Sequence, residues 1–285
     1  MRLGGSTGPM YRLRTQHPLT RKLNWAHLLG RARKERTTMD ERRACCSAAF
    51  LAVVSLTAVN ASAQYGAGHG HEQGQGNPNP AVSPVQSRAY GLTYGEWSAR
   101  WWEWAFSLPL DNSPLFGTAD CSVGQSGHVW FLAGSPSPQP HCTVPAGTAL
   151  FFPIINAECS TIPGDNTGDT TEAGLRSCAD ALANLIDPTT LNATMDGVPL
   201  TRLSQYRAQS PLFPIGPLPG PSNNNLGFYF TGNLTPAGTT GTSVGDGFYL
   251  MLHPLSAGPH VLHFHGEIPS FSFVVDMTYY LTVKP

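Results

Sequence analysis

Leu92-Thr-Tyr-Gly-Glu-Trp-Ser-Ala-Arg-Trp-Trp-Glu-Trp-Ala-Phe-Ser-Leu-Pro109 is the stretch that decides the fold, and it holds four of the six tryptophans of the chain. Thr93 and Glu96 have the spacing of a capping box, in which each side chain bonds to the backbone N–H of the other residue. Pro109 lacks a backbone N–H and is expected to stop the helix. The stretch therefore predicts a helix that begins after Thr93 and ends before Pro109.

Tryptophan side chains lie on more than one side of this predicted helix. At 100° per residue, Trp97, Trp101 and Trp104 form one stripe, and Trp102 and Phe106 lie opposite. Burial of three indole rings, at roughly 200 Å² each and about 25 cal/mol per Å², contributes at most about 15 kcal/mol. The helix is therefore expected to be enclosed by a folded domain, but it indicates no activity.

The N-terminal quarter of the chain predicts export. The apolar run 44–63 is too short to span a bilayer, follows Arg42 and Arg43, and ends in the cleavage pattern Ala61-Ser62-Ala63. Four segments are therefore expected: an upstream extension absent from the mature protein (1–38), a signal peptide starting at Met39 (39–63), a flexible Gly/Pro/Gln-rich linker (64–87) and a globular domain (88–285). The mature protein is expected to be secreted or periplasmic in a bacterium.

Removal of residues 1–63 makes the chain acidic. That segment carries 11 of the 17 basic residues and 3 of the 18 acidic ones, so residues 64–285 keep 6 basic and 15 acidic residues, a formal charge of −9. This balance argues against a nucleic acid or an anionic membrane as the partner. No integral membrane segment is expected after cleavage, and the oligomeric state is left open.

Four cysteines follow the predicted cleavage site. An even number of cysteines in an exported chain predicts two disulfides, with three possible connectivities. Pairing of sequence neighbours, Cys121–Cys142 and Cys159–Cys178, is the simplest of the three. The C-x₂-C spacing of structural zinc sites is absent, which favours disulfides over metal thiolates.

From Leu110 onward, short apolar runs alternate with Gly, Pro, Ser and Asn clusters. This pattern predicts a mainly β, single-domain antiparallel β-sandwich of the jelly-roll or immunoglobulin-like type, with one buried Trp-rich N-terminal helix and one further amphipathic helix. The second helix is expected to be capped by Asp169. A hairpin is expected at Asp196-Gly197, a long surface loop over 208–225, and three antiparallel strands over 247–252, 258–266 and 271–283.

Several of these stretches resemble a family of uncharacterised exported bacterial proteins. The resemblance is carried by the opening helix, by Val123-Gly-Gln-Ser-Gly-His-Val-Trp-Phe-Leu-Ala-Gly134, by Val144-Pro-Ala-Gly and by Gly258-Pro-His-Val-Leu-His-Phe. It covers nearly all of the predicted mature domain. The resemblance implies export and a single domain, and it implies no catalytic residue.

The strongest candidate for chemistry is His263-Phe264-His265-Gly266-Glu267. On a strand, His263, His265 and Glu267 share one face, and two imidazoles with a carboxylate can hold a divalent metal such as zinc. Glu267 is also a candidate catalytic residue, and His253 and His260 are candidate further ligands. The alternative is a solvent-exposed strand face on which alternating histidines have no function.

Two weaker sites remain. An acidic segment containing Glu158, Asp165, Asn166 and Asp169 could bind calcium, although helix capping also explains Asp169. Ser126, in Gly124-Gln-Ser-Gly, superficially resembles the serine of a nucleophile elbow, although no strand-to-helix turn is expected there.

The sequence leaves two classes of function open. One is an exported metal-dependent hydrolase of a small ester or lactone, in which a metal-bound water attacks the carbonyl. The other is a non-catalytic, secreted β-sandwich that binds a carbohydrate or a surface partner. Both imply a small-molecule or carbohydrate ligand, and neither requires a nucleotide cofactor.

Overall fold

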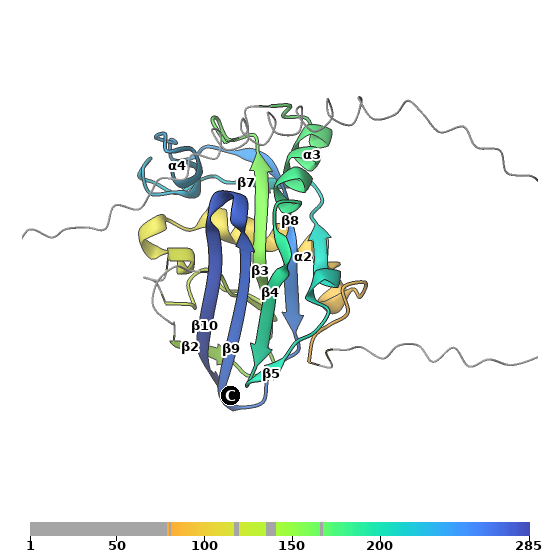
Figure 1. Ribbon diagram of the computed structural model, residues 1–285. Helices are drawn as coiled ribbons and strands as arrows, with labels where there is room; N and C mark the ends of the chain where they lie inside the picture. The colour runs from red at the N-terminus through yellow and green to blue at the C-terminus, as the bar shows by residue number, and fades with distance from the viewer. Residues whose placement is uncertain (1–78, 80, 117–119, 135–140, 166–167) are drawn as a thin grey trace, which may run out of the picture.

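The computed structural model describes residues 79, 81–116, 120–134, 141–165 and 168–285 of the 285-residue chain (Figure 1). The predicted upstream extension and signal peptide, and most of the predicted linker, lie outside these residues. The α-helices are α2 (Tyr94–Ser107), α3 (Glu172–Ala183) and α4 (Leu226–Thr231). The 3₁₀ turns are η1 (Ala89–Gly91), η2 (Leu110–Asn112), η3 (Pro114–Phe116), η4 (Leu203–Tyr206) and η5 (Pro269–Phe271). The strands are β1 (Val129–Phe131), β2 (His141–Pro145), β3 (Ala149–Ser160), β4 (Asp187–Met195), β5 (Val198–Pro199), β6 (Arg207–Gln209), β7 (Phe213–Ile215), β8 (Gly241–Leu252), β9 (Gly258–Ile268) and β10 (Phe273–Lys284).

The strands form two mixed sheets. Sheet A has the order β1-β3-β8-β6, with β7 also paired to β8, and sheet B has the order β2-β10-β9-β4-β5. The predicted mainly β sandwich is therefore confirmed. The sheets are not wholly antiparallel, because β1 pairs with β3 and β2 pairs with β10 in parallel. The chain passes from β1 in sheet A to β2 in sheet B and back to β3 in sheet A. Neither parallel pair is therefore joined by a direct hairpin. This strand order does not establish a jelly-roll or immunoglobulin-like topology.

Sheet A lies between α2 and sheet B (Figure 1). Consecutive side chains of a strand point to opposite faces. Accordingly, Phe151 of β3 packs against Tyr94 of α2, with ring centroids 5.9 Å apart, and Phe152 packs against Phe264 of β9, at 4.8 Å. Burial on both faces explains the nearly continuous apolar sequence of β3.

The tryptophan helix is buried as predicted. The capping box of Thr93 and Glu96 is present in both directions. Trp101 and Trp102 are 2% and 4% exposed, and the Trp101 indole N–H donates to the Leu132 carbonyl at 2.8 Å. α2 therefore forms a third layer that covers sheet A.

Helix α3 packs on the C-terminal end of β3 and the N-terminal end of β8. Its N-cap is Thr171, whose hydroxyl accepts from the Gly174 N–H, so the predicted cap at Asp169 is wrong. The Asp169 carboxylate instead accepts the Thr171 N–H at 2.8 Å, in a local turn that precedes the helix. The helix begins two residues later than predicted, and the sequence could not distinguish the two positions because Asp and Thr are both good N-cap residues.

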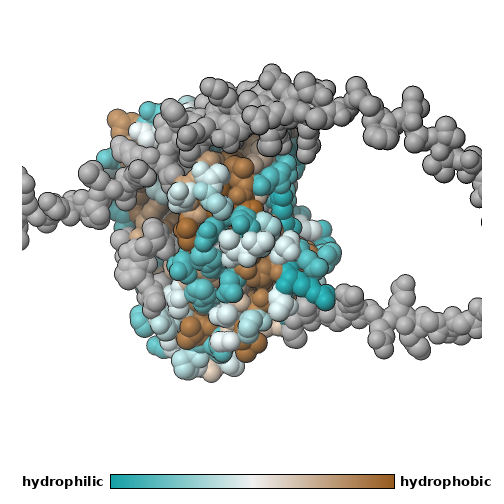
Figure 2. Space-filling model, viewed as in Figure 1, coloured by the Kyte–Doolittle hydropathy of each residue, from teal (hydrophilic) through white to brown (hydrophobic). Residues whose placement is uncertain are grey.

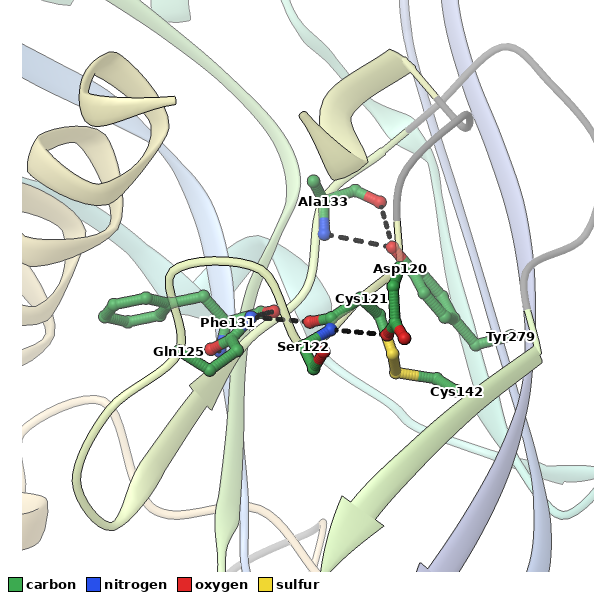
Figure 3. Close-up of a disulfide and its surroundings, with 8 residues drawn as sticks. All are labelled: Asp120, Cys121, Ser122, Gln125, Phe131, Ala133, Cys142 and Tyr279. Carbon is green, nitrogen blue, oxygen red and sulfur yellow. Dashed lines mark hydrogen bonds between the residues drawn. A yellow bond between two sulfur atoms is a disulfide. The ribbon is translucent and has the colours of Figure 1, made fainter. Parts of the chain in front are cut away.

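Both predicted disulfides, Cys121–Cys142 and Cys159–Cys178, are present. The first ties β2 to a turn that the Gln125 side chain holds, since Gln125 donates to the Phe131 carbonyl and accepts the Phe131 N–H (Figure 3). The second ties β3 to α3. Stable disulfides indicate an oxidising, extracytoplasmic environment. Among the described residues, no helix is long and apolar enough to cross a bilayer.

The ordered contacts of the domain begin before residue 88. The Asn79 side chain accepts the Thr201 N–H at 2.7 Å, and Val82 is fully buried in a bridge to Leu252 of β8. Asn79 and Val82, which composition assigns to the linker, thus pack on the domain. Val82 is an apolar residue within a polar stretch, and its side chain is part of the core.

Two further predictions need correction. The segment 208–225 is not one long loop, because it contains the end of β6 and all of β7. The prediction of three antiparallel strands is confirmed for β9 and β10, which pair antiparallel in sheet B, but β8 lies in the centre of sheet A and pairs with neither. The hairpin at Asp196-Gly197 is confirmed, and both residues have positive φ (51° and 76°), as a tight β4–β5 turn requires.

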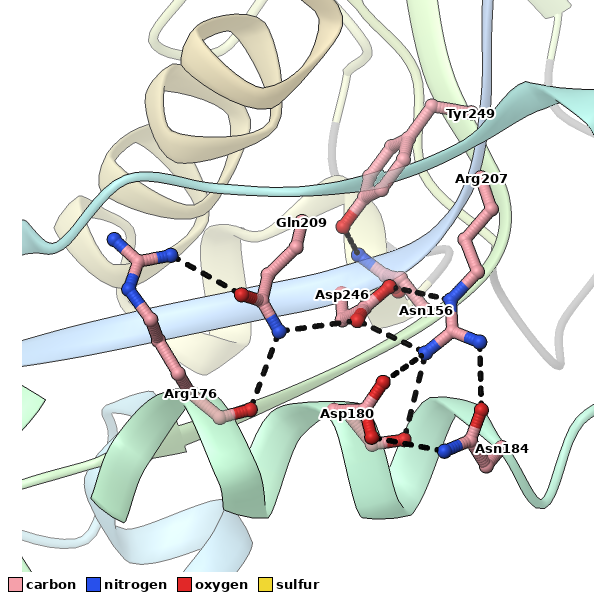
Figure 4. A network of polar contacts seen from close by, with 8 residues as sticks. All are labelled: Asn156, Arg176, Asp180, Asn184, Arg207, Gln209, Asp246 and Tyr249. Atoms are coloured by element: carbon pink, nitrogen blue, oxygen red, sulfur yellow. Dashed lines mark hydrogen bonds and ion pairs between the residues drawn. The ribbon is translucent and has the colours of Figure 1, made fainter. Parts of the chain in front are cut away.

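A polar network connects β6, β8 and α3 (Figure 4). Arg207 makes two hydrogen bonds of 2.9 and 3.0 Å to Asp246, whose side chain is 3% exposed, and a third of 2.9 Å to Asp180 of α3. Gln209 also donates to Asp246. Because Asp246 is nearly inaccessible, loss of Arg207 would leave a buried charge without its partner, which is costly.

Candidate functional site

An apolar pocket lies along the edge of sheet A that β1 leaves uncovered. β1 pairs only with Ala149–Phe151, so among the described strands β8 is the sole partner of β3 from Pro153 onward. The pocket has a volume of about 150 Å³. A dry apolar cavity of about that volume holds one benzene-sized molecule in other proteins. The site is therefore suited to a compact ligand rather than to a polymer.

Several elements that are distant in sequence supply the walls. α2 contributes Trp101 and Trp102, η3 ends in Phe116 at the pocket, α4 contributes Tyr229 and Phe230, and the start of β10 contributes Val275. The aromatic side chains contact one another: the ring centroids are 6.3 Å apart for Trp102–Phe230 and 4.8 Å apart for Phe116–Tyr229. The Trp102 indole N–H makes no hydrogen bond of ordinary length and angle, although it lies near the Tyr249 hydroxyl, which accepts from the Asn156 amide at 3.4 Å.

Two carboxyl groups, those of Glu158 and Asp165, line the same pocket. They are 8% and 7% exposed and hydrogen-bond to each other. Glu158 also accepts from the Ser243 hydroxyl at 2.5 Å, and Asp165 accepts from the N–H and hydroxyl of Ser160 at 2.9 and 2.6 Å. The serines thus fix both carboxyls at the end of β3.

Burial makes ionisation of these acids costly. Desolvation, followed by the nearby Asp165 charge, raises the pKa of Glu158 well above its usual value. Desolvation also raises the pKa of Asp165 to about 6, although hydrogen bonds from Ser160 act against this rise. The hydrogen-bonded pair therefore keeps a proton at pH values where two exposed carboxyl groups would both be ionised. Carboxyls with raised pKa values in a pocket are typical of functional sites.

The predicted histidine cluster is elsewhere, on the open face of sheet B (Figure 2 shows this face as a mixture of hydrophilic and apolar patches). The Nε2 atom of His263 lies 2.8 Å from Asp276, and that of His265 lies 3.0 Å from Glu267. The Nδ1 atom of His265 is 3.8 Å from the same Asp276 oxygen. His263, His265 and Glu267 thus share one face as predicted, but each imidazole is paired with a carboxylate.

The other two candidate ligands do not join this cluster. His260 hydrogen-bonds to Asp196 at 2.7 Å, at the β4–β5 turn, and His253, which follows the end of β8, contacts the Ser83 hydroxyl at 3.0 Å. Within the part of the chain that the structure describes, no three His, Cys, Asp or Glu side chains are grouped as metal ligands. The zinc site stays a prediction.

The remaining sequence candidates are separated. Of the predicted calcium ligands, Glu158 and Asp165 meet in the pocket, Asp169 forms the turn before α3, and Asn166 lies outside the described residues. Calcium binding by this set is still only predicted. Ser126 is exposed in the turn that Gln125 holds, between Cys121 and β1 (Figure 3 shows the turn), and its role as a nucleophile is likewise untested.

The sequence predicts that Glu158 and Asp165 belong to one site, but it predicts a calcium site and not the apolar pocket. The available signal was a carboxylate within the apolar strand β3, directly before a disulfide cysteine. A charged residue in a strand buried on both faces needs a partner or a raised pKa. The aromatic walls could not be found in this way, since a buried aromatic residue is ordinarily part of a core.

Neither a protein-family model, nor a curated protein, nor a solved structure matches this chain significantly.

Proposed function

We propose that this domain is an extracytoplasmic binding protein for a compact, mainly apolar small molecule, and that the pocket at the edge of β3 is its binding site. The observation that carries the proposal is the pocket itself, an aromatic-walled space of about 150 Å³ that also contains a pair of buried carboxyl groups. An apolar pocket with a few convergent polar groups is the usual form of a small-molecule site.

Thermal unfolding with small ring compounds tests this proposal. Toluene and benzyl alcohol are expected to raise the melting temperature in a concentration-dependent way, because a ligand that binds only the native state stabilises it. In Val275→Trp an indole occupies the pocket, so we expect the shift to disappear. Val261→Trp is the matched control, because Val261 is 39% exposed on β9 and does not line the pocket. Equal shifts in the two variants would refute the proposed site.

The second candidate function is the predicted metal-dependent hydrolase of a small ester or lactone. The observation in its favour is that His263 and His265 both approach one oxygen of Asp276, at 2.8 and 3.8 Å. Two imidazoles and a carboxylate are a known ligand set for zinc. Zinc content and ester or lactone turnover, measured before and after chelation in the wild type and in His263→Ala/His265→Ala, test it. Loss of both in the double variant is expected; turnover unaffected by chelation would exclude it.

A further inference from the structure

Among the residues that the structure describes, no cationic side chain lines the pocket that holds the Asp165 carboxylate. The 6 basic residues of segment 64–285 all lie elsewhere: Arg88, Arg100, Arg176, Arg202, Arg207 and Lys284. No histidine is among the residues that line the pocket. Within the described part of the chain, the Asp165 carboxylate is therefore balanced by hydrogen bonds from Ser160 and by its hydrogen bond with Glu158, and not by a cation. A buried charge without a counter-charge is costly.

The walls of the pocket independently favour a cation. Six aromatic side chains line it: Trp101, Trp102, Phe116, Tyr229, Phe230 and Phe273. The faces of aromatic rings attract ammonium groups, most strongly in the case of tryptophan, and this attraction grows when water is excluded. Trp102 is 4% exposed, so its ring is removed from bulk water.

From these two features we infer that the ligand is a small organic ammonium ion, namely one ring or short chain that bears a protonated amine. The ammonium group would donate to the Glu158–Asp165 pair, and the apolar part would contact the aromatic walls. This inference rests on the proposed function, because it names the ligand class of the same pocket. The volume of about 150 Å³ restricts the apolar part to about one six-membered ring.

Benzylamine and benzyl alcohol make a matched pair of probes, because they have nearly the same shape and only the former carries a charge. We expect calorimetry on the full chain at about pH 7.5 to give a dissociation constant at least about tenfold lower for benzylamine. At about pH 5 only about a tenth of Asp165 is ionised, given a pKa of about 6. Benzylamine, which is still a cation there, should then bind about tenfold more weakly, whereas benzyl alcohol should not change.

Variants separate this charge effect from changes in the fold. Asp165→Asn keeps an oxygen that can accept from Ser160 but removes the charge, so it should abolish the preference for benzylamine over benzyl alcohol. Asp111→Asn, an exposed residue of η2, removes a charge outside the pocket and should keep the preference. If benzyl alcohol binds as tightly as benzylamine to the wild type, the inference is overturned and the proposed binding function stands. If neither compound binds, both are overturned.

Discussion

At the scale of single residues, the buried carboxyl pair makes the stability of the fold depend on pH. The pKa of Asp165 rises from 3.8 to about 6 on folding, so between these values the native state binds more protons than the unfolded state. The stabilisation from this group is fully present below about pH 4 and is lost as the pH rises through 6. We therefore expect the free energy of unfolding in urea to fall by on the order of 1–3 kcal/mol between about pH 4 and pH 7.

Asp165→Asn should reduce this fall, because its side chain does not titrate, whereas Asp111→Asn should leave it as in the wild type. The comparison between variants is needed because other carboxyl groups titrate at neighbouring pH values. Hydrogen bonds lower the pKa of Asp169 and Asp187 below the usual value, and their stabilisation is lost only as the pH falls below about 4. The same pH profile in Asp165→Asn and the wild type would contradict the assignment.

Arg207 provides a second test at this scale. Arg207→Ala leaves the carboxylate of Asp246 buried without its ion partner (Figure 4). Removal of one partner of a buried pair costs about 3–5 kcal/mol. Arg100→Ala is the control, because Arg100 is 61% exposed in its pair with Glu103 and such pairs contribute about 0–1 kcal/mol. Similar losses of stability in chemical denaturation of the two variants would show that Asp246 is not buried as described.

At the scale of elements, α2 is expected to be the helix on which the fold depends most. Trp101→Ala removes a side chain that is 2% exposed and leaves the Leu132 carbonyl without its donor. Replacement of a buried tryptophan by alanine costs about 3–5 kcal/mol. Trp97→Ala, at a half-buried position on the same helix, should cost less. The two free energies of unfolding, measured in guanidinium, should differ by at least about 1 kcal/mol, and the opposite order would be inconsistent with the layer arrangement.

The elements that sequence predicts well are those with local causes. The capping box of Thr93 and Glu96 and the turn at Asp196-Gly197 depend only on nearby residues, and both are confirmed. The cap of α3 was misplaced by two residues because Asp169 and Thr171 are both capable of it. The sheet to which β8 belongs could not be predicted from hydrophobic pattern, since that pattern shows which face is buried and not which strand is adjacent.

At the scale of the whole molecule, the candidate site is formed by contacts between distant parts of the chain. Glu158 and Ser243 are 85 residues apart in sequence and joined by one short hydrogen bond. Their proximity follows from the antiparallel pairing of β3 with β8, in which Glu158 is opposite Gly245. The walls come from α2, α4 and β10. The sequence could identify the acidic residues, but the pocket needed the register of the sheet and the position of each helix.

The indole N–H resonances of the chain test the central claim, that the pocket at the edge of β3 is the binding site. In a ¹H–¹⁵N spectrum of the full chain titrated with benzyl alcohol, we expect shifts for Trp101 and Trp102, which line the pocket. The indole signals of Trp97 and Trp130, which do not line it, should stay in place. Saturable shifts of Trp97 or Trp130 with Trp101 and Trp102 unchanged would show that benzyl alcohol binds outside this pocket.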